Sequence, residues 1–393
     1  MTARGAQRQT AGPAAVDLRL LSLPTVEVLA AGHDRAPQER RELVVMGITS
    51  DNGAMGWGEC SALNRPTYTS EWARGSFAAL TDLLSSAEPV PRSLAPAHPM
   101  AAAGFEMALT DLRLRGQGRS LAASLGSRRA SVPAGAAVGL APLDELTGRV
   151  ATLVDAGLGR IKLKIEPGQD REPVEALRSR HPDLEIQVDG NGSYRPDDLS
   201  VLLGLVDYEV RVIEQPFPAD DASHETIRAS RALIDAGFAL VGDEAVRDLE
   251  DARRLHALGM LSAISLKPAR VGGLAAATKL HDWAVHEGIA LTAGGMLECG
   301  LGRHALAAFA SLDGFTIAGD LSPARRWLAD DPWPDLHLTS RPFPARIDVP
   351  QGVGVAPPPD PDTLDRYTVE RSTFGVHLDA LYESAHGRRA GGG

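Results

Sequence analysis

The stretch RIKLKIEPG (160–168) is followed at short intervals by EIQVDGNG (185–192), RVIEQP (211–216), ALVGDEAV (239–246) and AISLKP (263–268). Each stretch contains a short run rich in Ile, Val and Leu, with charged or amide side chains within it or directly after it. The stretches recur about every 25 residues, and the segments between them, such as REPVEALRSRH (171–181), place apolar residues at helical spacing. This alternation predicts parallel strands joined by helices.

The same rhythm continues outward in both directions, through SVPAGAAVG (131–139), ALTAGGM (290–296) and FTIAGDLS (315–322). Eight strands alternating with helices over about 190 residues favour a closed parallel barrel. A doubly wound open sheet is the alternative, but the sequence lacks the glycine-rich phosphate fingerprint that usually follows its first strand. We therefore predict an α/β fold, a modified TIM barrel of the (β/α)7β type, over residues 131–322.

The residues before the barrel have a different pattern. VDLRLLSLPTVEV (16–28) and RELVVMGITSDNGAMGWGEC (41–60) predict antiparallel strands, and helical patterns follow at 69–86 and 101–118. We expect residues 17–130 to form an α+β capping domain over the barrel mouth, after a flexible arm at 1–16. The proline-rich segment 323–385 is expected to return to the capping domain, and residues 386–393 to form a tail.

Composition narrows the class of partner. The net charge is −11, with 40 basic and 51 acidic residues and no basic run, which argues against nucleic acid and anionic membranes. The two cysteines, Cys60 and Cys299, lack CxxC spacing, and no apolar run reaches the roughly 18 residues that span a bilayer. We expect a cytoplasmic homo-oligomer that acts on a small molecule.

Charged side chains gather where the predicted strands end, the edge at which barrels of this kind place catalytic groups. They are Lys162 and Lys164 on the second strand, Asp189 and Asn191 on the third, Glu214 on the fourth, Asp243 and Glu244 on the fifth, and Lys267 on the sixth. Charge inside a barrel is costly unless it is paired or bound to a metal. This edge is therefore the candidate site.

Three of these carboxylates, Asp189, Glu214 and Asp243, end successive strands. Carboxylates brought together repel one another unless a cation lies between them, and an all-oxygen set suits Mg²⁺ better than Zn²⁺. The alternative is that the acids form internal salt bridges with the lysines. We favour a Mg²⁺ site.

The lysines point to a reaction. In an eight-stranded ring, strands two and six are four apart, so Lys164 and Lys267 should face each other across the barrel. A lysine base would remove the proton α to a carboxylate, and Mg²⁺ would stabilise the resulting enolate. We expect Lys162 and the metal to lower the pKa of Lys164, and Lys162 to contact the substrate carboxylate.

At these motifs the chain resembles the enolase superfamily, in its muconate-lactonising subgroup. The similarity covers residues 17–355 and is carried by GWGEC (56–60), KLKIEPG (162–168), QVDGN (187–191), IEQP (213–216), GDEAV (242–246), SLKPARVGG (265–273), GGMLECGLGRHALAAFASL (294–312) and FTIAGDLS (315–322). It is closest to the o-succinylbenzoate synthases and N-acylamino acid racemases of that subgroup. That superfamily uses a Lys or His base with Mg²⁺.

The resemblance implies a role for each residue. Asp189, Glu214 and Asp243 would hold Mg²⁺, Lys164 would be the base, Lys267 would act on the opposite face, and Glu244 would support the metal site. Substrate contacts would come from Lys162, Asn191, Arg270, Gly294, Gly295 and Met296. The implied activity is o-succinylbenzoate synthesis by dehydration. The alternatives are N-succinylamino acid racemisation, a related reaction on another acid, or a non-catalytic binding protein.

Two comparisons within the superfamily narrow these expectations. Mandelate racemase-like members use a His at the seventh strand, where this chain has Gly294-Gly295-Met296, and dipeptide epimerases carry Asp-x-Asp where it has Asp320-Leu321-Ser322. The substrate-capping loop motif of the family is missing from residues 24–40. Because this loop differs, the identity of the substrate is not determined by the resemblance. The predicted metal ligands and lysines are retained, so the resemblance still indicates the reaction class.

Overall fold

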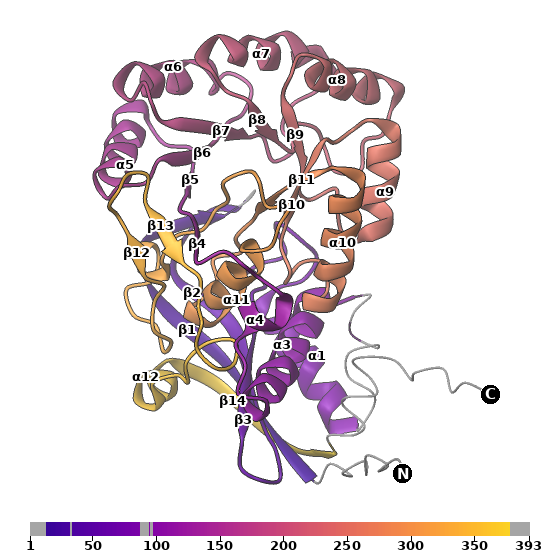
Figure 1. Ribbon diagram of the computed structural model, residues 1–393, viewed down its shortest axis with the longest axis vertical. Coiled ribbons are helices and arrows are strands. Elements are labelled where there is room, and N and C mark those ends of the chain that lie inside the picture. The colour runs from indigo at the N-terminus through magenta and orange to yellow at the C-terminus, as the bar shows by residue number, and fades with distance from the viewer. Residues whose placement is uncertain (1–12, 32–33, 87–93, 95–96, 378–393) are drawn as a thin grey trace, which may run out of the picture.

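A computed structural model of the protein describes residues 13–31, 34–86, 94 and 97–377. Its centre is a seven-stranded parallel sheet whose strands lie side by side in chain order. They are β5 (Ala136–Val138), β6 (Arg160–Lys164), β7 (Glu185–Asp189), β8 (Val212–Glu214), β9 (Ala239–Gly242), β10 (Ala263–Leu266) and β11 (Ala290–Ala293). The sheet is curled, and helices lie outside it (Figure 1). The predicted alternation of strand and helix is confirmed.

The helices that cover the sheet follow the strands in turn. They are α5 (Leu143–Asp155), α6 (Arg171–Arg180), α7 (Leu199–Gly204), α8 (His224–Asp235), α9 (Leu249–Leu258), α10 (Leu274–Glu287) and α11 (Gly300–Ala310), with 3-10 turns at Pro196–Asp198 and Leu205–Tyr208. Buried apolar residues such as Ile161, Val188 and Leu233 fill the layer between β5–β9 and the outer helices. This packing fixes the strand ends that carry the candidate site.

Two of the eight predicted strands differ from expectation. The run 315–322 is not a strand in the structure. It contacts β11 through a single bridge, Leu291 to Phe315, and through the Asp320 N–H to the Ala293 carbonyl at 2.8 Å. On its other side, the Gly135 N–H donates to the Leu321 carbonyl at 3.0 Å. The sheet therefore has seven strands, with an irregular segment at the eighth position.

The run 131–139 is also divided. Its first part is β4 (Ser131–Pro133), which pairs antiparallel with β13 (Arg346–Asp348) and, through it, with β12 (Leu338–Thr339). Only its second part, β5, joins the parallel sheet. The segment after the barrel is thus more ordered than its proline content indicates, and it includes a 3-10 turn at Ala324–Arg326 and α12 (Pro361–Tyr367).

The N-terminal part forms a four-stranded antiparallel sheet in the order β14-β1-β2-β3. The strands are β1 (Pro13–Ala31), β2 (Asp34–Thr49), β3 (Met55–Cys60) and β14 (Thr368–His377), so residues 13–16 are strand and not part of a flexible arm. Helices α1 (Ala73–Ser86) and α3 (Pro99–Gly116) pack on this sheet through residues such as Phe77 and Phe105, and α4 (Leu121–Leu125) follows. Residues 1–12 and 378–393, which include the predicted tail, lie outside the described residues.

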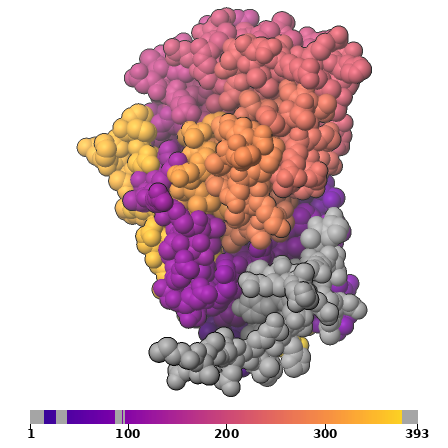
Figure 2. Space-filling view, turned by 45° about the vertical axis from the view of Figure 1, so that its right-hand side comes forward, coloured from indigo at the N-terminus to yellow at the C-terminus, as the bar shows by residue number. Residues whose placement is uncertain are grey.

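The N-terminal and barrel parts are in direct contact, as the space-filling view also shows (Figure 2). Within the capping-loop region, residues 24–31 and 34–40 extend the β1–β2 ribbon, and the Val26 N–H donates to the Trp327 carbonyl at 3.0 Å. Among the described residues, no helix has the length and apolar character needed to cross a bilayer.

A buried carboxylate joins β3 to the start of α11. Glu59 is fully buried and accepts hydrogen bonds from the Gly302 N–H at 2.8 Å and the Cys299 N–H at 3.2 Å. The positive end of a helix dipole favours a carboxylate at this position. Burial is the main reason that the pKa of Glu59 rises from 4.5 to about 7.

Replacing Glu59 with Gln is expected to flatten the pH dependence of stability. The folded chain binds this proton more tightly than the unfolded chain, so the free energy of unfolding falls as pH rises from 4.5 to 7. The Glu59 share of that fall is on the order of 3 kcal/mol. Urea unfolding at pH 5 and pH 7.5 measures it, with the exposed Glu250→Gln as control. Equal slopes in wild type and Glu59→Gln would contradict the assignment.

Candidate active site

The ends of three neighbouring strands place one lysine and two carboxylates in a row. Lys164 is the register partner of Asp189 across β6 and β7, and Asp189 is the partner of Glu214 across β7 and β8. Asp243 directly follows β9, the next strand in the sheet. Asp189, Glu214 and Asp243 are each 1% exposed, so this row of acids is enclosed by the protein.

Lys162 lies at the centre of a buried ion network. Its Nζ is 2.6 Å from Asp320 Oδ2, 2.8 Å from Glu214 Oε1 and 3.3 Å from Asp189 Oδ2. Asp320 is held in turn by the guanidinium of Arg160, which points inward from the start of the same strand. Burial alone would lower the pKa of Lys162, but the three carboxylates raise it well above its usual value. Lys162 is therefore a fixed positive charge.

Lys164 lies beside Lys162 on the same face of β6. Its Nζ donates to Asp189 Oδ2 at 2.6 Å and to Asn191 Oδ1 at 2.5 Å. Burial opposes the charged form, yet Asp189 outweighs it and the pKa of Lys164 is raised. The sequence-based expectation of a lowered pKa included the charge of a bound metal and stays a prediction; among the protein groups alone, Asp189 raises this pKa more than Lys162 lowers it.

Lys267 holds the other end of the row. Its Nζ donates to Asp243 Oδ2 and to the hydroxyl of Tyr68, both at 2.7 Å. Tyr68 comes from the N-terminal domain and also donates to Asp243 Oδ2 at 2.8 Å. Arg270 is 4% exposed and bonds Asp243 Oδ1 at 3.0 Å and the Val246 carbonyl at 2.8 Å. In the structure, Arg270 therefore contacts Asp243, one of the three carboxylates of the row; its predicted contact with substrate stays a prediction.

Glu244 and Asn191 link the two halves of the site. The Asn191 amide donates to Glu244 Oε1 at 2.5 Å, while Glu244 Oε2 is buried and has no hydrogen-bond partner. Burial, with help from the charges of Asp243 and Asp189, raises the pKa of Glu244 to about 7. A buried carboxylate oxygen without a partner is unfavourable unless a donor or cation reaches it.

The loop after β11 approaches Lys267 closely. A Cβ at Gly294 would collide with Cε of Lys267 and lie 2.6 Å from Ser265 Oγ, so only glycine fits there without displacement. A Cβ at Gly295 would lie 3.0 Å from Nη1 of Arg303. The side chain of Met296 is 3% exposed and packs in the core of the N-terminal domain.

Arg41 ties this loop to the N-terminal domain. Arg41 is 1% exposed, and its guanidinium donates hydrogen bonds to backbone carbonyls. These include the carbonyls of Met296 and Leu297, both at 3.1 Å, and of Ser61 at 2.7 Å. Leu297 has a φ of 53°, a conformation that costs energy for a leucine. Arg41 therefore holds a strained loop next to Lys267.

Within the described residues, no group of three or more His, Cys, Asp or Glu side chains is arranged as a metal site. The contacts above show why, because lysines and Arg270 take oxygens of Asp189, Glu214 and Asp243. These are the internal salt bridges that the sequence left as the alternative to a metal.

Sequence reasoning missed three members of the network: Tyr68, Arg160 and the role of Asp320. Tyr68 lies in a loop without periodic pattern, so nothing local indicates it. One unused signal is lysine usage, because the chain has four lysines among 40 basic residues and three of them, Lys162, Lys164 and Lys267, are in this network. Because lysine is rare in the rest of the chain, its use at these three positions indicates a functional role.

Comparison with known proteins places the chain in a family. The family model described as "Enolase C-terminal domain-like" matches residues 145–362. The o-succinylbenzoate synthase of Bacillus subtilis is 38% identical, over 86% of this chain and 92% of that protein. The N-succinylamino acid racemase of an Amycolatopsis species is 36% identical, over 92% and 98%.

A solved structure agrees with these relatives. The probable mandelate racemase of Alicyclobacillus acidocaldarius has a TM-score of 0.80 at 32% identity, covering 93% of this chain and 99% of that one. Both the family model and the relatives extend across the strands that carry Lys164, Asp189 and Lys267. The chain is therefore an enzyme and belongs to the enolase superfamily.

Proposed function

We propose that this enzyme removes the proton α to a substrate carboxylate in a Mg²⁺-dependent reaction, and that the reaction is dehydration of the o-succinylbenzoate synthase type. The observation that carries the proposal is the placement of Lys164 and Lys267 at the two ends of the row Asp189, Glu214 and Asp243. A substrate carboxylate between them would present one face to each lysine.

The oxygen donors of the row suit Mg²⁺ by type, and the ion would have to displace the lysine and Arg270 contacts that now hold them. Asp189, Glu214 and Asp243 supply the oxygen ligands that this ion prefers. Burial raises the pKa of Glu214 to about 7; Lys162 opposes the shift, and the charges of Asp189 and Asp243 add to it. A cation among them would relieve that repulsion, and the free Oε2 of Glu244 is a further acceptor nearby. When bound, Mg²⁺ supplies electrostatic stabilisation of the negative charge that develops on the substrate carboxylate.

Three lysines of this chain would carry out proton transfer, enolate stabilisation and orientation of the substrate. Lys164 Nζ would accept the α-proton in its neutral form, after its own proton has left to solvent, because the Asp189 carboxylate favours the protonated amine. Lys267 would stay protonated and stabilise the enolate from the other face. The protonated Lys164 would then give this proton to the β-hydroxyl, which would leave as water and give the aromatic product. Lys162, held by Asp320, would orient the carboxylate as a fixed charge.

The second candidate is racemisation of an N-succinylamino acid. It is favoured by the symmetry of the site, because Lys164 and Lys267 each donate to one carboxylate of the row at 2.6 Å and 2.7 Å. The identity to the Amycolatopsis racemase, 36% over 92% of the chain, supports it equally. Here the two lysines would exchange roles with the enantiomer bound.

Exchange of the α-proton in D₂O tests the proposal directly. The enzyme is incubated with Mg²⁺ and a panel of acids that includes the substrate of o-succinylbenzoate synthases and several N-succinylamino acids. Deuterium uptake and product formation are followed by NMR. Proton loss coupled to aromatic product supports dehydration, and exchange with loss of optical activity supports racemisation. No exchange with any acid by a folded, Mg²⁺-loaded enzyme would reject α-proton abstraction.

Lys267→Ala is expected to separate the two candidates. In a racemase, this variant should still exchange the α-proton of one enantiomer, through Lys164, and lose exchange of the other by at least ~10²-fold. In a synthase with one productive face, dehydration itself falls because the enolate loses its cationic partner. Exchange of each pure enantiomer is measured separately, and equal loss for both would remove the two-base model.

Gly294→Ala is expected to reduce turnover by about 10²-fold, because the added methyl must displace Lys267 or Ser265. Gly148→Ala in α5, where an added Cβ meets nothing within 4 Å, is the matched control. The effect should appear in kcat at unchanged thermal midpoint. Full activity of Gly294→Ala would show that the position of Lys267 is not critical.

The finer architecture belongs to the same proposal. We infer that the irregular segment 315–322 completes a (β/α)7β barrel, with residues 17–130 as capping domain and 323–385 as a returning segment. Pairing of β14 with β1 and the contact of Tyr68 with Asp243 support this division. The homo-oligomer stays a prediction.

A further inference from the structure

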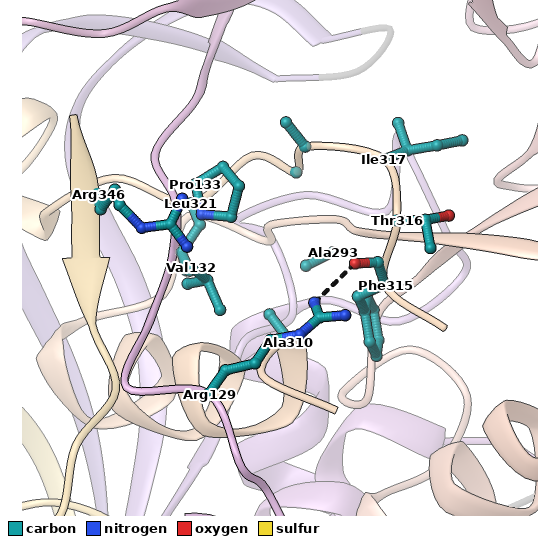
Figure 3. Close-up of a pocket in the computed structure, with 12 residues that line it drawn as sticks. Arg129, Val132, Pro133, Ala293, Ala310, Phe315, Thr316, Ile317, Leu321 and Arg346 are labelled. Atoms are coloured by element: carbon teal, nitrogen blue, oxygen red, sulfur yellow. Dashed lines mark hydrogen bonds between the residues drawn. The ribbon is translucent and has the colours of Figure 1, made fainter. Parts of the chain in front are cut away.

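A second pocket lies beside the irregular segment 315–321, and no residue of the charged network lines it. Its volume is about 170 Å³. Two arginines, Arg129 and Arg346, are its only charged lining residues, and the rest of the wall is neutral, including Val132, Phe315 and Leu321. Figure 3 shows the Arg129 guanidinium directed to the Phe315 carbonyl and the Arg346 guanidinium beside Pro133, both among the residues that line the pocket.

The contacts of Arg346 orient its guanidinium without neutralising it. Nε donates to Ser131 Oγ at 2.7 Å and Nη2 donates to the Ser131 carbonyl at 2.8 Å. Both partners are uncharged, and within the described part of the chain Arg346 forms no ion pair with a carboxylate. The remaining nitrogen, Nη1, is therefore available to a ligand.

Arg129 lies in the segment just before β4, whereas Arg346 lies on β13. Nη1 of Arg129 donates to the Phe315 carbonyl at 2.9 Å. Its charge partner is Asp313, at 4.0 Å, whose side chain is 86% exposed and therefore well screened by water. Two positive groups thus share a wall without an acid in it, although the chain as a whole carries a charge of −11.

This combination favours one class of ligand. Guanidinium groups bind carboxylates through paired, charge-assisted hydrogen bonds, and apolar walls favour a hydrocarbon body. We propose that this pocket is a second anion site, separate from the active site, that binds the carboxylate of a small organic acid with an apolar body. The segment that forms its wall also carries Asp320, the partner of Lys162, so the ligand contacts a part of the chain that reaches the active site.

Calorimetric titration of the full-length, Mg²⁺-loaded enzyme tests the site with hexanoate, acetate and inorganic phosphate at equal ionic strength. Hexanoate is expected to bind at least ~10-fold more tightly than acetate, because its methylene groups are buried on the apolar wall. Arg346→Gln and Arg129→Gln should each weaken hexanoate binding by at least ~10-fold. Arg253→Gln on α9, whose partner is the exposed Glu250, is the matched control and should bind as wild type.

Hydrogen–deuterium exchange of the wild-type enzyme locates the ligand without any variant. Saturating hexanoate should slow exchange in peptides that cover 129–133 and 315–321. Protection confined to 160–165 and 263–268 would place the anion in the active site and overturn the proposal. So would tighter binding of phosphate than of hexanoate, absence of binding, or unchanged affinity in both pocket variants.

Discussion

Replacing Lys164 with Ala is expected to abolish most proton abstraction, with kcat lower by about 10² to 10⁴-fold, the usual contribution of a general base. Lys164 Nζ is the amine bonded to Asp189 and Asn191, at 2.6 Å and 2.5 Å. Removing it leaves Lys162 nearby, but carboxylates, Asp320 foremost, raise the pKa of Lys162 well above its usual value and so disfavour it as a replacement base. The measurement is the rate of α-deuterium exchange at saturating substrate.

The scarcity of lysine provides a strict control for this variant. Lys279 on α10 is exposed and is the one lysine of the chain outside the site. Lys279→Ala should therefore leave kcat unchanged, and any general effect of losing a lysine would appear there. Exchange by Lys164→Ala at the wild-type rate would show that another group is the base, while loss of exchange in both variants would indicate a nonspecific cause.

The strands that carry the site were predictable because each gives two signals together. The run 160–164 alternates buried Ile161 and Leu163 with Lys162 and Lys164, and its partner 185–189 ends on Asp189 at the matching register. Parallel strands in chain order then bring those ends together at one edge. Local pattern and topology agree there, which is why seven of the predicted strands appear in the sheet.

The eighth predicted strand failed for a packing reason. FTIAGDLS has the apolar start of a strand, but it contains Gly319, whose missing side chain allows the backbone to approach Ala293 too closely for a Cβ. The segment therefore bonds to β11 at isolated points instead of in continuous register. Sequence periodicity carries no information about such an approach, because it depends on the neighbouring strand.

The contact of Tyr68 with the site could not be predicted for a different reason. It joins residues 175 positions apart, and its loop has no pattern that indicates a function. The same holds for the carboxylate contacts that raise the pKa of Lys164, because the sequence places Asp189 near Lys164 but does not tell which oxygen meets the amine. Positions follow from the fold, whereas individual hydrogen bonds follow from side-chain packing.

Asp189→Asn is expected to weaken Mg²⁺ binding by more than ~10²-fold, since even residues that support metal ligands contribute 10 to 100-fold. Asp189 is enclosed between Lys162 and Lys164, so its amide replacement removes one charge from the proposed ligand set while keeping nearly the same volume. Calorimetric titration with MgCl₂ measures the loss without substrate. The exposed Asp282→Asn on α10 is the control.

This titration also decides between the two interpretations of the carboxylate row. If Asp189, Glu214 and Asp243 serve only as partners of the lysines, the wild-type enzyme has no specific Mg²⁺ site. Wild type and Asp189→Asn then give the same heat as buffer. If they hold the metal, Mg²⁺ must draw their charge from Lys162, Lys164 and Lys267, and wild-type binding saturates at one ion. Equal, saturable binding by wild type and Asp189→Asn would place the ion elsewhere and remove this carboxylate from the metal site.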